Sequence, residues 1–309
     1  MSRTLRVGTR GSLLARAQTD LVVKALAVEA GAVDIEIVPI VTEGDTSSAA
    51  VNQLGSTGVW VSALRTALLA GEIDIAVHSF KDLPTAAAEG ITIGAVPVRE
   101  DPRDALVARD GLTLGELPAG AKVGTGAPRR TAQINALGLG LELVGLRGNV
   151  DTRVQRVLGG DLDAVVLAYA GLRRIGRQDV VTEVLDPIQV LPAPAQGALA
   201  IECRTEDVEV IALLKALDHA DTRAAVTAER ALLAALEAGC SAPVGALADI
   251  VEGDDGTEVF LRGSVTAADG SAAVRLSATG PTTDADGVGR RLAAELLADG
   301  ADQLMGSST

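Results

Sequence analysis

Aromatic residues are almost missing from this chain. Its 309 residues include one Trp, one Tyr and two Phe. The hydrophobic cores must therefore be built from Ala, Val, Leu and Ile, and an aromatic ring in a polar segment stands out. Trp60 and Phe80 are two such rings, because both flank polar stretches rather than apolar runs.

Cysteine, lysine and long apolar runs are also scarce. Cys203 and Cys240 are the two cysteines of the chain, which is too few for a disulfide framework and favours a reducing, cytoplasmic location. No apolar region opens the chain, and no stretch reaches about 18 uncharged apolar residues, so we expect neither a signal peptide nor a membrane span. The two histidines and two cysteines lie far apart in sequence and give no metal-ligand spacing, so we expect no metal.

Positive charge is limited as well. The formal net charge is −14, which argues against a nucleic-acid partner, since such binding depends on neutralising phosphates with basic residues. Any site for an anion must therefore be local and basic. Four of the 27 basic residues are lysines and the others are arginines. Arginine suits bidentate binding of carboxylates.

The chain is long for one core and suits two or three domains. Strand-like and helical patterns alternate from residue 4 to residue 98, and again from residue 105 to residue 168. Such β-α-β series predict an α/β fold with mainly parallel sheets. Three alternating runs and a closing helix after residue 221 predict a small α+β domain.

We therefore predict three domains. The first is a discontinuous α/β lobe of residues 1–98 and 196–217, since the apolar run near residue 200 returns to it. The second α/β lobe covers residues 103–191, and the α+β domain covers residues 219–309.

The segment Ile73–Pro84, IDIAVHSFKDLP, predicts a buried strand that ends in a polar turn. Ligands of open α/β sheets bind beyond the carboxyl ends of the strands, so this turn is a candidate floor of an active site. Asp82 is the candidate acid or electrostatic stabiliser, because a carboxylate near Arg and Lys stays ionised. The alternative is a surface aspartate that pairs with Lys81 or caps the turn. His78 is interpreted as a hydrogen-bonded structural residue.

The clearest chemical signal is a set of basic residues where strands meet helices. Helix N-termini add N–H donors and positive potential at these junctions, so the set predicts a polyanion site. The alternative is that exposed arginines merely solvate helix starts. No phosphate-loop or dinucleotide signature accompanies the set, so a nucleotide is not favoured. Its members are Arg10, Arg129, Arg130, Arg147, Arg153, Arg173 and Arg174.

Taken together, these segments resemble the porphobilinogen deaminase (hydroxymethylbilane synthase) family. The matching pieces keep the family's order along almost the whole chain. They are RVGTRGSLLARAQ, IDIAVHSFKDLP, EDPRDAL, VGTGAPRR, LRGNVDTR, LAYAGLRR, LPAPAQGALAIECR and EAGCSAPVGA.

The resemblance implies two lobes like those of periplasmic-type binding proteins and a third, cysteine-bearing domain. It implies a covalent dipyrromethane cofactor, linked through a thioether to Cys240. Four porphobilinogen molecules would be joined head to tail with loss of ammonia, and water would release linear hydroxymethylbilane. Each pyrrole carries acetate and propionate groups, so the growing chain needs many arginines. The family also suggests a monomer.

The resemblance also carries over individual site residues. The catalytic aspartate falls on Asp82, which would stabilise cationic charge on the reacting pyrrole. The expected cofactor-binding residues are Cys240, Lys81, Ser79, Thr125, Arg129, Arg130, Arg153 and Gln196. The expected substrate-binding residues are Arg10, Ser12, Arg147, Arg153, Arg174 and Trp60.

One function from another class fits the same lobes and arginines: a non-catalytic, two-lobed binding protein for a small polyanion. It does not explain a third domain that presents a thiol, and it predicts an export signal, which we do not find. Release of ammonia from porphobilinogen discriminates between the two functions.

Overall fold

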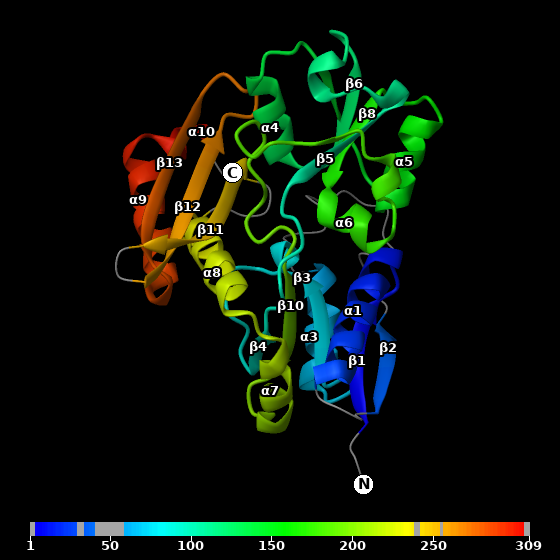
Figure 1. Cartoon of the computed structure of the whole chain (residues 1–309), viewed down its shortest axis with the longest axis vertical. Helices are drawn as coiled ribbons and strands as arrows, with labels where there is room; N and C mark the ends of the chain where they lie inside the picture. The colour runs from blue at the N-terminus through cyan, green and yellow to red at the C-terminus, as the bar shows by residue number, and fades with distance from the viewer. Residues whose placement is uncertain (1–3, 30–33, 41–58, 238–241, 254–255, 306–309) are drawn as a thin grey trace. The chain divides into compact units, whose positions relative to one another are not determined.

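The computed structural model describes residues 4–29, 34–40, 59–237, 242–253 and 256–305. The chain groups into two compact units (Figure 1). Unit 1 consists of residues 1–100 and 198–223, and unit 2 of residues 101–197 and 224–309. Within the described ranges, no helix has the length and apolar character needed to cross a membrane.

Unit 1 is built on a five-stranded mixed sheet. The strand order is β2-β1-β3-β10-β4, in which β2, β1 and β3 run parallel and β10 is antiparallel to both of its neighbours. The strands are β1 (Leu5–Arg10), β2 (Ile35–Ile40), β3 (Ile75–Ser79), β4 (Ile91–Ala95) and β10 (Leu199–Arg204).

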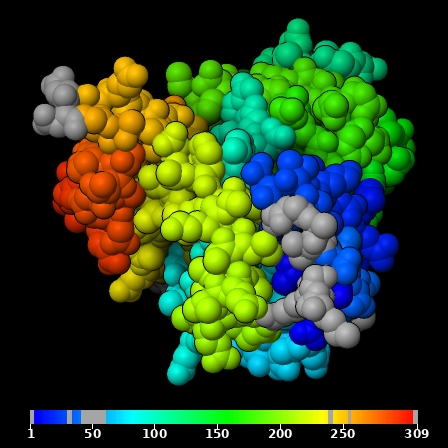
Figure 2. Space-filling view, turned by 60° about the horizontal axis from the view of Figure 1, so that its bottom comes forward, coloured from blue at the N-terminus to red at the C-terminus, as the bar shows by residue number. Residues whose placement is uncertain are grey.

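Helices cover both faces of this sheet, which explains why β3 is apolar almost throughout. Ile75 and Val77 pack with α1 (Leu13–Glu29) and α7 (Val208–Leu214) on one face. Ala76, on the opposite face, packs with α3 (Val59–Leu69). In Figure 2 the yellow-green residues of α7 lie on the surface turned towards the viewer.

The first part of unit 2 contains a second five-stranded mixed sheet, in the order β7-β6-β8-β5-β9. One face packs against α4 and the other against α5 and α6. The strands are β5 (Asp104–Ala108), β6 (Lys122–Thr125), β7 (Glu142–Gly145), β8 (Ala164–Ala168) and β9 (Glu183–Val184). The helices are α4 (Pro128–Ala136), α5 (Val150–Leu158) and α6 (Tyr169–Arg174).

The two five-stranded sheets follow one plan. Each contains three parallel strands joined by helices, β1, β2 and β3 or β6, β7 and β8. An antiparallel strand pairs with the third of them: β10, which follows β3 in the chain, or β5, which precedes β6. The predicted α/β class is thus confirmed. The strands of each sheet are mainly parallel, as expected, except that one strand, β10 or β5, runs antiparallel to both of its neighbours.

The C-terminal part of unit 2 is an antiparallel three-stranded sheet, β11-β12-β13, with helices packed on it (Figure 1). This is the α+β arrangement that the alternating runs predict. Its strands are β11 (Val244–Gly253), β12 (Gly256–Thr266) and β13 (Ala273–Pro281). Its helices are α8 (Ala220–Ala235), which begins within unit 1, α9 (Ala285–Ala298) and α10 (Ala301–Leu304).

Short 3-10 helices complete the described secondary structure. They are η1 (Phe80–Asp82), η2 (Arg109–Gly111), η3 (Leu114–Glu116), η4 (Gln178–Val180), η5 (Lys215–Leu217) and η6 (Thr282–Asp284). The contacts within the chain divide it into two compact units. The finer division into three domains stays a prediction.

Gly289 allows α9 to approach α8 closely. A Cβ atom at this position would collide with the carbonyl oxygen of Ala228 and would lie 2.7 Å from the Cβ atom of Ala231. Both obstacles are parts of a packed helix, so neither can move away cheaply.

We therefore expect Gly289→Ala to lower the free energy of unfolding by about 1–3 kcal/mol, although alanine is the better helix former. Urea unfolding measures this loss. Gly115→Ala is the control, because nothing lies within 4 Å of a Cβ atom there. An increase in stability of the Gly289 variant would contradict the close approach of the two helices.

Candidate functional site

In unit 1, polar side chains gather where β1 and β3 end. Arg10 is the last residue of β1 and Ser79 the last of β3, and the two strands are parallel neighbours. Ser12 caps α1, because its Oγ accepts a hydrogen bond from the amide of Ala15 at 3.3 Å. Gln18 of α1 donates from Nε2 to Ser79 Oγ at 2.8 Å. The N-terminal part of α1 is thereby tied to the end of β3.

Asp82 lies in the 3-10 turn that follows β3. Phe80 and Leu83 on either side of it are buried, and the amide of Leu83 donates to the carbonyl of Phe80 at 3.1 Å. The Asp82 side chain itself is exposed, and within the described part of the chain its carboxylate forms no ion pair. The alternative of a surface pair with Lys81 is therefore not found. Two buried neighbours fix the turn and hold the carboxylate of Asp82 at the edge of the sheet.

His78, just before this turn, is a buried structural residue, as expected. Its Nε2 lies 3.2 Å from Oε2 of Glu202, a buried residue of β10. Arg65 of α3 donates from Nη2 to Oε1 of the same carboxylate at 2.7 Å. Burial would raise the pKa of Glu202, but the His78 and Arg65 side chains outweigh it and lower the pKa to about 2. This cluster joins α3, β10 and β3.

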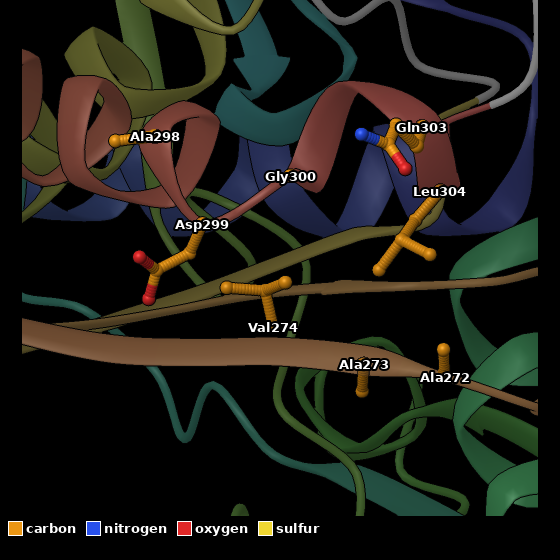
Figure 3. Close-up of a pocket in the computed structure, with 8 residues that line it drawn as sticks. All are labelled: Ala272, Ala273, Val274, Ala298, Asp299, Gly300, Gln303 and Leu304. Atoms are coloured by element: carbon orange, nitrogen blue, oxygen red, sulfur yellow. The ribbon is translucent and has the colours of Figure 1, made fainter.

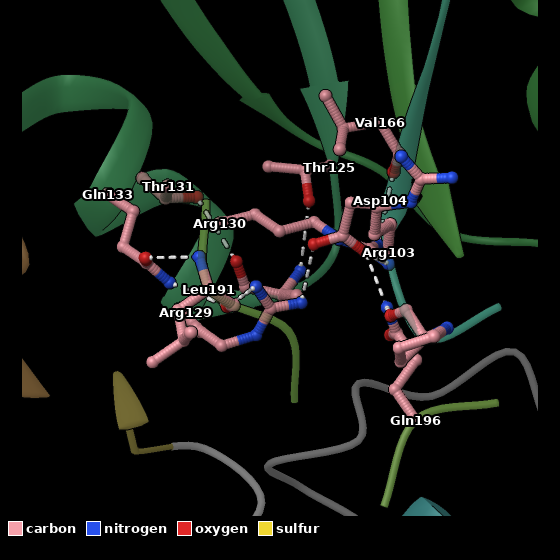
Figure 4. A network of polar contacts seen from close by, with 12 residues as sticks. Arg103, Asp104, Thr125, Arg129, Arg130, Thr131, Gln133, Val166, Leu191 and Gln196 are labelled. Carbon is pink, nitrogen blue, oxygen red and sulfur yellow. Dashed lines mark hydrogen bonds and ion pairs between the residues drawn. The ribbon is translucent and has the colours of Figure 1, made fainter. Parts of the chain in front are cut away.

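In unit 2, Arg129 and Arg130 converge on one buried carboxylate, that of Asp104 (Figure 4). Arg129 Nη2 donates to Asp104 Oδ2 at 2.8 Å, and Arg130 Nη2 donates to Oδ1 at 2.8 Å. Gln196 Nε2 donates to Oδ1 at 2.8 Å as well. Burial would raise the pKa of Asp104, but the charges of the two arginines keep it far below its usual range. The two arginines are 4% and 5% exposed, so they do not simply solvate the start of a helix.

The other predicted residues of unit 2 lie near this cluster or at the same edge of the sheet. Thr125 ends β6 and is buried, and its Oγ1 accepts from the amide of Ala127 at 3.3 Å. Arg153 of α5 is half-buried, and burial together with the charge of Arg130 lowers its pKa. Arg174 of α6 donates to the carbonyl of Gly197, next to Gln196, at 2.6 Å. Arg147, two residues beyond β7, is exposed.

Close packing requires a glycine at position 126, between β6 and α4 in the VGTGAPRR segment. A Cβ atom there would lie 2.5 Å from the carbonyl oxygen of Leu146 and 3.8 Å from Nη2 of Arg153. The chain can thus bring β6, the loop after β7 and α5 together only with glycine at this position.

The cluster fits a ligand with several carboxylates. Arg129, Arg130 and Arg153 carry three positive charges against the single negative charge of Asp104. Nε of Arg130 is buried and has no hydrogen-bond partner within the described ranges. A buried donor without a partner costs free energy, which an acceptor oxygen of a ligand removes. The donors and the charge therefore suit the acetate and propionate groups of a dipyrromethane.

Among the residues that the sequence analysis does not identify are Asp104 and Gln18, beside the predicted site residues. Asp104 lies in the EDPRDAL segment, and the signal was available, because a carboxylate that opens an apolar strand must be paired when it is buried. Gln18 has no comparable signal, since one amide on an apolar helix is usually exposed.

Cys240 and the side chain of Trp60 lie outside the described part of the chain. The other cysteine, Cys203, is a buried core residue of β10, as expected, and burial raises the pKa of its thiol to about 11.

A shallow cavity of about 450 Å³ lies on the C-terminal part of unit 2, between β13 and the end of α9 (Figure 3). Its walls are mostly small apolar residues, together with Asp299 and Gln303. It holds no cluster of basic or nucleophilic side chains, so it lacks the chemistry of the strand-end clusters.

Comparison with protein families defines the class of the chain. The sequence model described as "Porphobilinogen deaminase, dipyromethane cofactor binding domain" matches residues 5–212, and that described as "Porphobilinogen deaminase, C-terminal domain" matches residues 223–298. The matched domains define a cofactor-binding enzyme of the transferase class. The chain belongs to the porphobilinogen deaminase family. The resemblance and the dipyrromethane cofactor expected from the sequence are thereby confirmed at the level of the family.

Curated relatives agree with this assignment over nearly the whole chain. The porphobilinogen deaminase of Nocardia farcinica is 61% identical over 306 residues, covering 97% of this chain and 88% of that protein. Those of Mycobacterium bovis and Mycobacteroides abscessus are 60% and 58% identical, covering 97% and 98% of this chain and 98% and 99% of their own lengths.

Solved structures align with the chain more weakly. The methionine binding protein MetQ aligns at a TM-score of 0.45 and 14% identity, covering 69% of this chain and 89% of that one. The Bordetella pertussis BvgS periplasmic VFT2 domain aligns at 0.43 and 17%, covering 69% and 86%. At these TM-scores and identities we draw no conclusion from the alignments. The fold class is assigned from the strand order and the family.

The Glu202 cluster predicts a dependence of stability on pH. The folded-state pKa of Glu202, about 2, lies below its ordinary value of 4.5. Its contribution to stability is therefore complete above the ordinary value and is lost as the pH falls through the folded-state value. The loss amounts to roughly 3 kcal/mol.

Urea unfolding at several pH values measures this loss. We expect the free energy of unfolding to fall less steeply in Glu202→Gln than in the wild type over that window, although other carboxylates titrate there too. Glu89→Gln, which changes an exposed carboxylate of the same unit, is the control. Parallel profiles for the wild type and Glu202→Gln would contradict the assignment.

Proposed function

We propose that this chain is a hydroxymethylbilane synthase, which joins four porphobilinogen molecules head to tail into linear hydroxymethylbilane and releases ammonia at each addition. The observation that carries the proposal is the basic cluster at the strand ends of unit 2, in a chain of this family. We further propose that the protein works as a monomer in the cytoplasm and binds neither nucleic acid nor membranes.

In this proposal, the arginines of unit 2 bind carboxylates. Arg129, Arg130 and Arg153 hold the acetate and propionate groups of the cofactor, with Thr125 and Gln196 beside them, and Arg147 and Arg174 extend the basic edge for the growing chain. A carboxylate bound to a guanidinium accepts two parallel hydrogen bonds, which fixes its orientation as well as its position. The support is the net positive charge of the cluster and the buried Arg130 Nε.

The residues of unit 1 act on the incoming substrate. Arg10 and Ser12 at the start of α1 bind its carboxylates, with Ser79, Lys81 and Trp60 as further binding residues. Asp82 stabilises the positive charge that develops on the reacting pyrrole when ammonia leaves, because an oriented, ionised carboxylate costs no reorganisation at that moment. The exposure of Asp82, together with its lack of an ion pair within the described ranges, supports this role.

Cys240 holds the cofactor through its sulfur atom. When bound, the dipyrromethane supplies a tethered nucleophilic pyrrole carbon to which substrate is added. The rival function, a non-catalytic binder of a small polyanion, shares the arginines but needs neither Asp82 nor a thiol. Ammonia released from porphobilinogen by the purified chain separates the two, and its complete absence would favour the binder.

We expect Cys240→Ser to abolish covalent attachment of the cofactor, because a serine hydroxyl does not replace the thiolate as a nucleophile at neutral pH. The intact mass of the freshly purified protein measures attachment. Cys203→Ala is the control and keeps the added mass, since Cys203 is a buried core residue. A wild-type mass without an added dipyrrole, in an active preparation, would rule out this tether.

We expect Asp82→Ala to fold normally and to lower kcat by roughly 10²–10³-fold, since it removes charge stabilisation from the transition state. Steady-state release of ammonia gives kcat, and circular dichroism reports folding. Glu89→Ala, another exposed carboxylate of unit 1, serves as the control. Nearly normal turnover in Asp82→Ala would remove Asp82 from the mechanism.

A further inference from the structure

We propose that Asp104 is a positioning residue of the cofactor site: its carboxylate fixes the guanidinium groups of Arg129 and Arg130 in the orientation that binds the carboxylates of the cofactor. This inference rests on the proposed function. Asp104 is not among the predicted site residues. In this inference its carboxylate orients the arginines of the site before a ligand binds.

The geometry around Asp104 is specific. Its side chain is fully buried at the start of β5, and its two oxygens accept from three different side chains. Oδ2 takes one N–H of Arg129, while Oδ1 takes one N–H of Arg130 and one of Gln196. Each arginine is anchored a second time, Arg129 Nη1 to the carbonyl of Leu191 at 2.5 Å and Arg130 Nη1 to that of Val166 at 3.1 Å. Two anchors fix the plane of each guanidinium.

The negative charge of Asp104 also stabilises the positive charges of the two buried arginines. Burial lowers the pKa of Arg129 and the neighbouring Arg130 lowers it further, whereas the charge of Asp104 acts in the opposite direction. Without the carboxylate, two buried cations would repel each other and turn towards water. With it, Arg129 and Arg130 stay side by side, and the cluster with Arg153 keeps a net positive charge.

The carboxylate also leaves donors for a ligand. It engages a terminal nitrogen of Arg130, and the buried Nε of Arg130 has no hydrogen-bond partner among the described residues. An arrangement selected for stability alone would satisfy this donor, because buried ion clusters seldom stabilise a fold more than apolar packing does. A preorganised binding site keeps such a donor for the ligand.

Asp74 provides a matched control in unit 1. It is also a fully buried aspartate between two arginines, with Oδ1 at 3.0 Å from Arg6 Nη2 and at 2.8 Å from Arg204 Nη2. It directly precedes β3 and so lies at the end of that strand opposite to Ser79 and Asp82. Asp74→Asn and Asp104→Asn thus remove the same charge from similar pairs of arginines, one remote from the candidate site residues and one within them.

The experiment compares the wild type, Asp74→Asn and Asp104→Asn at a temperature where circular dichroism shows all three folded. Intact mass gives the fraction of chains that carry the dipyrrole, and ammonia release gives kcat and KM for porphobilinogen. Both variants should lose thermal stability. Only Asp104→Asn should load less cofactor or show a higher KM, by about tenfold to a hundredfold, as expected when binding groups are displaced by a fraction of an ångström to an ångström.

Equal loading and equal KM in the two variants would overturn the positioning role and leave only a structural one. A wild-type chain with neither dipyrrole nor ammonia release would overturn the proposed function instead. If Asp104→Asn does not fold, Asp104→Glu takes its place, because it keeps the charge and moves the carboxylate by one methylene. A folded Asp104→Glu should show the same defect in loading or KM, and wild-type values would overturn the inference.

Discussion

An ionised side chain can be buried only with partners around it, and this constraint organises both units. Asp104 is held by Arg129 and Arg130, and Glu202 by Arg65 and His78, all from other elements. Each carboxylate has its pKa lowered despite burial. Each cluster joins segments far apart in sequence: β5 with α4 and residue 196 in unit 2, and α3 with β10 and β3 in unit 1. The arginine-rich composition thus serves the interior as well as the binding surface.

Most of the secondary structure could be predicted from patterning alone. The strand predicted at the start of the Ile73–Pro84 segment is β3, because buried faces impose their periodicity on the sequence. Short helices such as α6 and α7 are not predictable in this way, since six or seven residues give too little periodicity to detect. The antiparallel direction of β10 is not predictable from local pattern either, because strand direction depends on pairing with distant residues.

The candidate site was predictable as a set of strand ends but not as a set of contacts. Arg10 and Ser79 lie where parallel strands end, as their sequence context suggests, and Thr125, which only the family resemblance supplies, lies at the end of β6. The sequence could not reveal that Arg129 and Arg130 are buried and share Asp104, because this depends on β5 running antiparallel beside β8. Local patterns locate the edge of a sheet, whereas long-range pairing decides which side chains meet there.

The scarcity of aromatic rings has a spectroscopic consequence. The single tryptophan, Trp60, belongs to α3 of unit 1, and the single tyrosine, Tyr169, belongs to α6 of unit 2. Fluorescence of the indole therefore reports on unit 1, and fluorescence of the Tyr169 phenol reports on unit 2. The guanidinium of Arg173 lies over the Tyr169 ring, 5.8 Å from its centroid. Each half of the chain thus carries its own intrinsic fluorophore, and no label is needed to follow the two separately.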